Sequence, residues 1–222
     1  MSSTNPADRP ADPAAPTPEP EPHEGGFRVR MEWNTDRGGS RYGELSEQIR
    51  RLMDLARYAS PTSELTDELI ADLESVNERL AGVQVDEWTS PASTRIDLPS
   101  RGNITVPPYE VINAGPDGVE ATVTFRPFHL GGNDAAHGGQ VAVAFDDLAG
   151  MASALAIRGV CRTAYLTVSY RSLTPLRTPL TCRTWVQNLE GRKAFVKGTL
   201  HDGERLCADL DALFIALKPG QP

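Results

Sequence analysis

The feature that most constrains this fold is a long apolar helix pattern that opens on two glycines. His137, Gly138 and Gly139 precede a helical stretch that runs to about Ile157. Two adjacent glycines leave the first backbone N–H groups uncovered by any Cβ, and the helix dipole adds partial positive charge there. Such a helix terminus can hold an oxyanion or polarise a carbonyl. The predicted core stripe of the helix is Val141, Phe145, Leu148, Ala152 and Leu155.

Strand patterns flank this helix. Val119–Phe125 alternates apolar and polar residues before it. Gly191 and Asp202-Gly203 are typical hairpin turns after it. One early strand, one long helix and a four-strand antiparallel meander predict an α+β fold, a curled sheet around a central helix. The four later strands are expected over Ala164–Tyr170, Leu180–Leu189, Ala194–Leu200 and Leu206–Leu217.

The N-terminal part of the chain is organised differently. Residues 1–26 are rich in Pro, Ala and acids, so they cannot offset their chain entropy and are expected to be disordered. Phe27–Trp33 alternates weakly, as a short strand or a docked arm would. Apolar stripes then predict a helical hairpin over residues 45–82, with Ser63 as the cap of its second helix. We therefore divide the chain into a tail (1–26), an extension (27–91) and a sheet-and-helix domain (92–222).

Composition narrows the function classes. The net charge is −8, and no stretch approaches 18 consecutive apolar residues, so we expect no membrane span. Residues 40–82 carry nine acids against five Arg, which argues against nucleic-acid binding. Three cysteines without Cys-x-x-Cys spacing fit reduced thiols, so we expect a cytoplasmic location, no disulfide framework and no metal site. The three are Cys161, Cys182 and Cys207.

A carboxylate on the central helix is the main candidate for chemistry. Asp146 shares a helix face with small residues, which would let a substrate or another backbone approach closely. We expect it to be buried, and a buried carboxylate needs a partner or a function. Asp147 lies about 100° further around the helix, and we assign it no role. The small residues of this face are Gly139, Ala142, Gly150 and Ser153.

Together these motifs resemble a known family. His137-Gly138-Gly139, Asp146, a strand that begins near Thr163 and ends in Tyr170, and the Gly191-Arg192-Lys193 hairpin resemble the hotdog-fold acyl-CoA thioesterases of the phenylacetate-pathway type. The resemblance spans residues 109–217. It implies a hotdog fold and hydrolysis of an acyl-CoA thioester, with no cofactor.

The resemblance assigns catalytic roles to particular residues. The N–H of Gly139 would hold the oxyanion, and Asp146 would act as general base or as nucleophile, which the sequence does not separate. Thr163 would orient the water or the carboxylate. We expect His137 to fix the glycine loop by bonding backbone groups, with Asn133 orienting the same loop. The family often has Asn or Gln six residues before the His, where this chain has Gly131.

The resemblance also implies how the substrate binds and how the chain assembles. Gly138, Arg171, Arg192 and Lys193 are the expected substrate contacts, the three cations meeting CoA phosphates. Residues 158–222 hold ten Lys or Arg and five acids, which is either a phosphate patch or a solvated sheet face. Gly139 and Asp146 lie about 10 Å apart along one helix, too far to serve one carbonyl. We therefore expect a homodimer or a dimer of dimers, in which each protomer completes the other's site.

Three questions stay open. A hotdog hydratase or dehydratase would pair a His with an acid, as His137 and Asp146 could. An acyl-CoA-sensing regulator would need no catalysis. Residues 44–82 would be either a lid over a longer acyl tunnel or a brace for the dimer, and the acyl group is not readable from the sequence.

Overall fold

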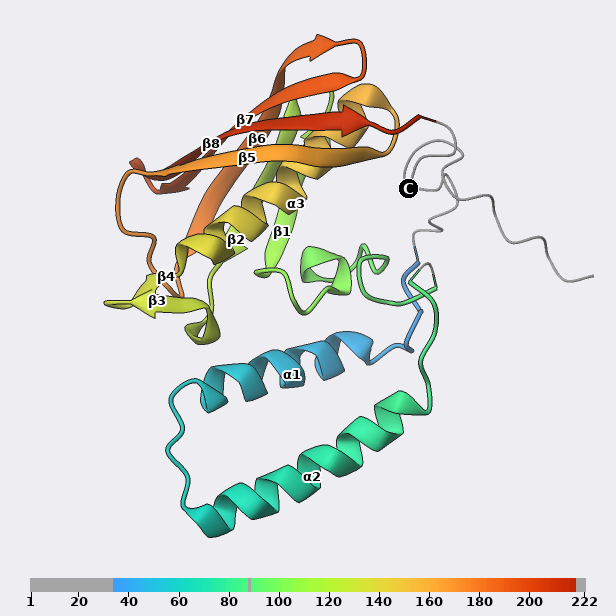
Figure 1. Ribbon diagram of the computed structural model, residues 1–222, viewed down its shortest axis with the longest axis vertical. Coiled ribbons are helices and arrows are strands. Elements are labelled where there is room, and N and C mark those ends of the chain that lie inside the picture. Colours follow the sequence, from blue (N-terminus) through green and yellow to red (C-terminus); the bar gives the residue numbers. More distant parts are fainter. Residues whose placement is uncertain (1–33, 88, 219–222) are drawn as a thin grey trace, which may run out of the picture.

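The structure is a computed structural model that describes residues 34–87 and 89–218. The tail and the strand expected over Phe27–Trp33 lie outside the described residues. Figure 1 shows two helices beside a sheet that lies against one long helix. In chain order the elements are α1 (Tyr42–Ala56), α2 (Ser63–Ala81), η2 (Pro99–Gly102), β1 (Tyr109–Gly115), β2 (Gly118–Thr124), η3 (Pro127–His129), β3 (Leu130–Gly132), β4 (Ala135–Ala136), α3 (Gly138–Ile157), β5 (Cys161–Tyr170), β6 (Pro179–Glu190), β7 (Lys193–Asp202) and β8 (Arg205–Ala216).

Six strands form one antiparallel sheet in the order β1-β2-β6-β7-β8-β5. The expected helix, the early strand and the four later strands are confirmed, but the four later strands do not form a meander in chain order. β5 pairs with β8 at the sheet edge. Of the four later strands, β6, β7 and β8 therefore pair with their neighbours in sequence as hairpins, and β5 does not. The turns have positive φ at Gly191 (59°) and Gly203 (58°), as the sequence predicts.

β1 is a strand that the sequence did not predict. It is the other edge of the sheet, and Tyr109 is its one buried residue. Its exposed residues include Val111 and Ile112, so the chain shows no alternation between apolar and polar residues here. Pairing with β2, rather than a buried face, makes this segment a strand.

α3 packs against every strand of the large sheet. Val141, Phe145, Leu148 and Ala152 are buried as expected, whereas Leu155 is 42% exposed and does not belong to the core stripe. Close packing between β7 and α3 explains the glycine at position 198. A Cβ there would lie 3.2 Å from the ring of Phe145, so glycine lets the helix approach the sheet.

By length and composition, α3 is also apolar enough to cross a membrane. It is the one helix of the described residues that passes this test, and 39% of its most apolar 18-residue window is buried. A core helix has the same composition, so this is weak evidence for a membrane span.

The helical extension attaches to the domain through α1. Arg126, just before η3, pairs with Asp54 (2.6 Å) and Glu47 (2.7 Å) of α1. α2 lies on the far side of α1 in Figure 1, and none of its residues is buried. The expected helical hairpin is therefore present, but the apolar stripe of α2 is not buried within this chain. Its cap is Thr62 rather than Ser63, since the Thr62 side chain accepts from Leu65 N at 3.3 Å.

The packing of α3 predicts that replacing two leucines of this helix by alanine lowers the free energy of unfolding by different amounts. Leu148 is 1% exposed, so Leu148→Ala should lower the free energy of unfolding by about 2–5 kcal/mol through lost burial and a cavity. Leu155→Ala makes the same chemical change at a position 42% exposed, and should cost under about 1 kcal/mol. Urea denaturation of both variants measures the difference. Equal losses would contradict the assignment of the core face.

Candidate functional site

The structure brings Asp146 and Thr163 together. Thr163 Oγ1 donates a hydrogen bond to Asp146 Oδ1 at 2.7 Å, from the start of β5 to the middle of α3. The register of β5 against β8 shifts between Thr163 and Tyr165, a bulge that redirects side chains locally. Both side chains are exposed in the single chain, so the expectation that Asp146 is buried is wrong. Among the residues that the structure describes, no other hydrogen bond engages Asp146, so its second carboxylate oxygen is available.

Asp146 and Thr163 line a cavity of about 610 Å³ on the side of α3 that faces away from the sheet core. Much of its wall is apolar, including Met151, Leu155 and Phe214, and Gly150 and Ala154 leave room along the helix. Cys161 also lines it, but burial raises the pKa of this thiol to about 11, so it is no thiolate nucleophile at neutral pH. All three cysteines are free thiols, and the cytoplasmic location stays a prediction.

His137 caps the N-terminus of α3. The ring Nδ1 of His137 accepts a hydrogen bond from Gly139 N at 3.0 Å. The backbone N–H of His137 donates to His129 O at 2.7 Å. The side chain therefore bonds the glycine loop, as its structural role requires. The same bond occupies the N–H that we assigned to the oxyanion. Gly139 can serve as the donor only after the imidazole of His137 turns away.

The other glycines of the loop are fixed by close contacts. A Cβ on Gly138 would lie 2.9 Å from the ring of Tyr170, whose hydroxyl donates to Gly138 O at 2.7 Å. A Cβ on Gly131 would lie 2.8 Å from the Cα of His137, so there is no room for the Asn or Gln that the family often has there. Asn133 is exposed in the β3–β4 turn with φ of 49°. Within the described residues no hydrogen bond joins its side chain to the glycine loop.

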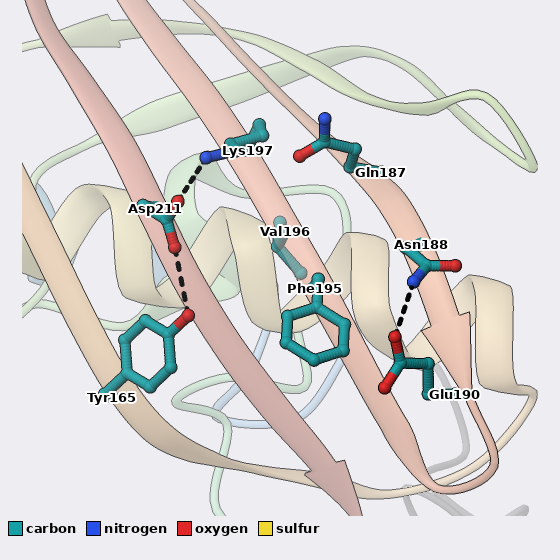
Figure 2. Close-up of a pocket in the computed structure, with 8 residues that line it drawn as sticks. All are labelled: Tyr165, Gln187, Asn188, Glu190, Phe195, Val196, Lys197 and Asp211. Atoms are coloured by element: carbon teal, nitrogen blue, oxygen red, sulfur yellow. Dashed lines mark hydrogen bonds and ion pairs between the residues drawn. The ribbon is translucent and has the colours of Figure 1, made fainter.

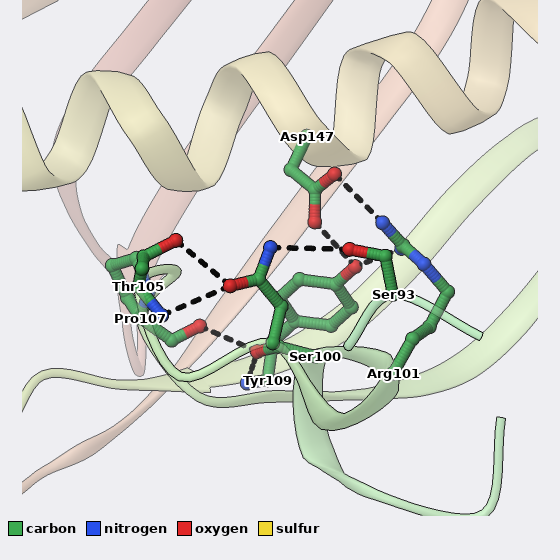
Figure 3. Close-up of polar contacts among 8 residues, drawn as sticks. Ser93, Ser100, Arg101, Thr105, Pro107, Tyr109 and Asp147 are labelled. Carbon is green, nitrogen blue, oxygen red and sulfur yellow. Dashed lines mark hydrogen bonds and ion pairs between the residues drawn. The ribbon is translucent and has the colours of Figure 1, made fainter. Parts of the chain in front are cut away.

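Asp147, to which the sequence assigned no role, forms a polar cluster shown in Figure 3. Arg101 Nη2 donates to Asp147 Oδ1 at 2.8 Å, and the hydroxyl of Tyr109 donates to Oδ2 at 2.6 Å. Arg101 also donates to the Tyr109 hydroxyl. Burial and the charge of Asp147 raise the pKa of Tyr109 far above its usual value, so it stays a phenol. Both oxygens of Asp147 are therefore engaged, unlike those of Asp146.

The predicted phosphate contacts lie at opposite ends of β5. Arg171 follows the strand and pairs with Asp209 at 2.5 Å. Lys193 pairs in register with Ile215, which also faces Arg162 at the other end of β5. Ten residues of strand separate these ends by about 30 Å, so Arg171 is not brought to the Arg192-Lys193 hairpin in one chain. The cavity itself is lined by three cations that the sequence did not single out, Arg101, Arg158 and Arg162.

Comparison with known proteins agrees with this arrangement. Residues 133–208 match the Thioesterase superfamily. Acyl-coenzyme A thioesterase THEM4 of Rattus norvegicus is 36% identical over 88 residues, which are 39% of this chain and 37% of that protein. THEM4 of Xenopus laevis is 38% identical over 85 residues, 37% of this chain and 38% of that protein. The match thus spans well under half of these relatives.

One solved structure extends the likeness to the helices. The crystal structure of RHA08564, a thioesterase superfamily protein, is 24% identical, with a TM-score of 0.68 over 82% of this chain and 97% of its own. That likeness shows a shared fold. The sheet-and-helix domain has the hotdog fold, and residues 133–208 within it are similar to the Thioesterase superfamily. A phenylacetate-pathway subtype stays a prediction.

The outer face of the hotdog sheet has a second hollow of about 480 Å³ (Figure 2). Tyr165 donates to Asp211 at 3.0 Å there, and Lys197 also pairs with Asp211. Tyr170 (54% exposed) and Trp185 (36% exposed) lie at the surface rather than in the core.

His129 connects α1 to the glycine loop of the hotdog domain. Its ring is buried, Nδ1 accepts from Arg126 N at 2.8 Å, and its carbonyl accepts the N–H of His137. Burial lowers the pKa of His129 to about 4, with a smaller lowering from Arg126 and Arg50, against the raising effect of Asp54. His129 is therefore neutral in the folded protein at neutral pH.

This depressed pKa predicts a pH dependence of stability. The unfolded chain binds a proton near pH 6.5, before the folded chain does near pH 4, so the stability that neutral His129 provides is lost as pH falls through this window. His129→Gln, which can still accept from Arg126 N, should flatten the fall in urea midpoint between pH 7 and 4.5. His201→Gln on β7 is the matched control and should keep the wild-type slope. An unchanged slope in the His129 variant would refute the assignment.

Proposed function

We propose that this protein is an acyl-CoA thioesterase that hydrolyses the thioester to the free acid and CoA. The observation that carries the proposal is the Asp146–Thr163 pair on an apolar cavity, with one carboxylate oxygen bonded and the other available. An apolar cavity suits an acyl chain, and the adjacent carboxylate suits attack on its carbonyl. Relatives named acyl-coenzyme A thioesterase support this substrate class.

The reaction needs three contributions from the protein. Backbone N–H groups polarise the thioester carbonyl and hold the tetrahedral oxyanion. Asp146 either takes a proton from the attacking water or attacks the carbonyl itself, forming an anhydride that water then cleaves. In both routes the C–S bond breaks, the acyl group gains the water oxygen and the CoA sulfur gains a proton. Thr163 holds Asp146 at the orientation that either attack requires.

A second protomer would supply the oxyanion donors. Gly139 lies about 10 Å along the axis from Asp146, so one α3 does not serve both ends of the same carbonyl. Val143 and Leu155 are exposed on α3, and β5 is an edge strand with ten residues to pair. Both features favour a dimer in which an antiparallel partner helix brings its glycine N-terminus to Asp146. Within the described residues the N–H of Gly138 has no acceptor, so it is the first donor available, with Gly139 joining when His137 turns.

The same assembly bears on CoA binding. In one chain Arg171 and the Arg192-Lys193 hairpin lie at opposite ends of β5. An antiparallel partner strand would bring the partner's opposite end alongside, so cations of two chains could meet one nucleotide. Arg158 and Arg162 add positive charge at the cavity mouth, which favours an anionic substrate such as CoA.

Removing the carboxylate tests the reaction. Asp146→Asn keeps the side-chain shape but removes the base or nucleophile, so kcat should fall at least about 100-fold. Thiol release from a series of acyl-CoA chain lengths measures this and finds the preferred acyl group. Asp202→Asn, in the hairpin between β7 and β8, makes the same change away from the cavity and should leave kcat unchanged. A folded Asp146→Asn variant with near wild-type turnover would end the proposal.

Complementation tests the composite site. Asp146→Asn and Gly139→Pro, which removes the N–H, should each be inactive alone. After co-refolding in equal amounts, random pairing makes about half of the dimers hybrids, and each hybrid has one site with both defects and one with neither. Roughly a quarter of wild-type activity should return. If hybrids are confirmed by mass and the mixture stays inactive, donor and carboxylate belong to the same chain.

The hydratase alternative gains no support from the geometry. The Nδ1 of His137 is engaged by Gly139 N, and within the described residues no hydrogen bond links His137 to Asp146.

A further inference from the structure

The cluster of Arg101, Tyr109 and Asp147 places a charged side chain from outside the central helix and sheet into the cavity wall. Arg101 belongs to η2, on the segment that links the helical extension to β1, yet it lines the same cavity as Asp146 and Thr163. The same cavity is lined by Ala114, Gly150 and Ala154, whose small size leaves space along its wall.

The backbone that presents Arg101 is held in an unfavourable conformation. Ser100, Arg101 and Gly102 have φ of 50°, 54° and 77°, three consecutive left-handed residues of which only the last is glycine. Such strain persists only where the surroundings impose it. Ser100 provides part of that restraint, because its hydroxyl donates to Pro107 O at 2.8 Å and accepts from Tyr109 N at 3.0 Å.

The guanidinium is held as firmly as the backbone. Asp147 and the Tyr109 hydroxyl bond two of its nitrogens, and the Arg101 side chain is 15% exposed (Figure 3). A planar group held at two points cannot swing aside like a surface arginine. It therefore acts as a fixed boundary of the cavity that Asp146 also lines.

We propose that Arg101 is a specificity-determining residue that limits the width of the acyl cavity, so that linear acyl chains are accepted over aromatic ones. The inference rests on the proposed thioesterase function. Asp147 and Tyr109 then act as positioning residues, which hold Arg101 in place through their oxygens. Because Asp147 neutralises Arg101, this wall does not require a charged acyl group.

A matched pair of substrates tests the inference. Octanoyl-CoA and phenylacetyl-CoA both carry eight acyl carbons but differ in width. Arg101→Ala should raise the ratio of kcat/KM for phenylacetyl-CoA over octanoyl-CoA at least about tenfold. Arg101→Met, which refills the space without charge, should bring the ratio back to within about threefold of wild type. Arg183→Ala removes an exposed arginine that pairs with Glu120 on the sheet, and should leave the ratio unchanged.

The design separates the possible outcomes. Arg101→Ala leaves the Asp147 carboxylate without its cationic partner. If that variant does not fold, Arg101→Ala combined with Asp147→Asn provides the same widening without an unpaired charge. An unchanged ratio in an active, folded variant, or an equal loss on both substrates, would overturn the inference and leave the thioesterase proposal intact. Wild-type protein that releases thiol from no acyl-CoA would instead defeat the proposed function.

Discussion

The packing of α3 against all six strands of the large sheet is the contact on which the rest of this structure depends. The sheet covers one face of the helix and buries residues such as Phe145 and Leu148 completely. The opposite face stays open, and that face carries Asp146 and the cavity. One helix therefore anchors the hotdog core on one side and presents the candidate chemistry on the other. A rigid, well-packed support is what a carboxylate needs if it is to hold a fixed position against a thioester.

Two contacts from outside the large sheet hold α3 at points that matter to this chemistry. Through Arg126 and the η3 turn, α1 supports His129, whose carbonyl accepts the N–H of His137 at the helix N-terminus. Through Arg101, the segment before β1 reaches Asp147 in the middle of the same helix. The first contact links α1 of the extension to the N-terminus of α3, and the second links the segment before β1 to the middle of the same helix.

Local patterns predicted the elements well and their neighbours less well. Val119–Phe125 and β7 alternate because one face of each is buried, and that alternation is visible in the sequence. β1 has one buried residue and no alternation, so only pairing with β2 reveals it. The alternation within β5 does not say which strand lies beside it, and β8 rather than β6 takes that place. Asp146 and Thr163 were predictable because a motif and a resemblance point to them. Arg101 was not, because a left-handed loop and a contact 46 residues away define its position.

The two adjacent carboxylates of α3 show how environment separates chemistry from structure. Both carboxylate oxygens of Asp147 accept hydrogen bonds, one from Arg101 and one from Tyr109. Protonation of Asp147, or its use as a nucleophile, would therefore break a partly buried ion pair. Asp146 accepts one hydrogen bond, from Thr163, and keeps an oxygen exposed to the cavity. A general base or nucleophile needs an accessible lone pair and a fixed orientation at the same time. Of these two neighbours only Asp146 has both, because the turn of about 100° between consecutive helix residues places Asp146 beside Thr163 and Asp147 beside Arg101 and Tyr109.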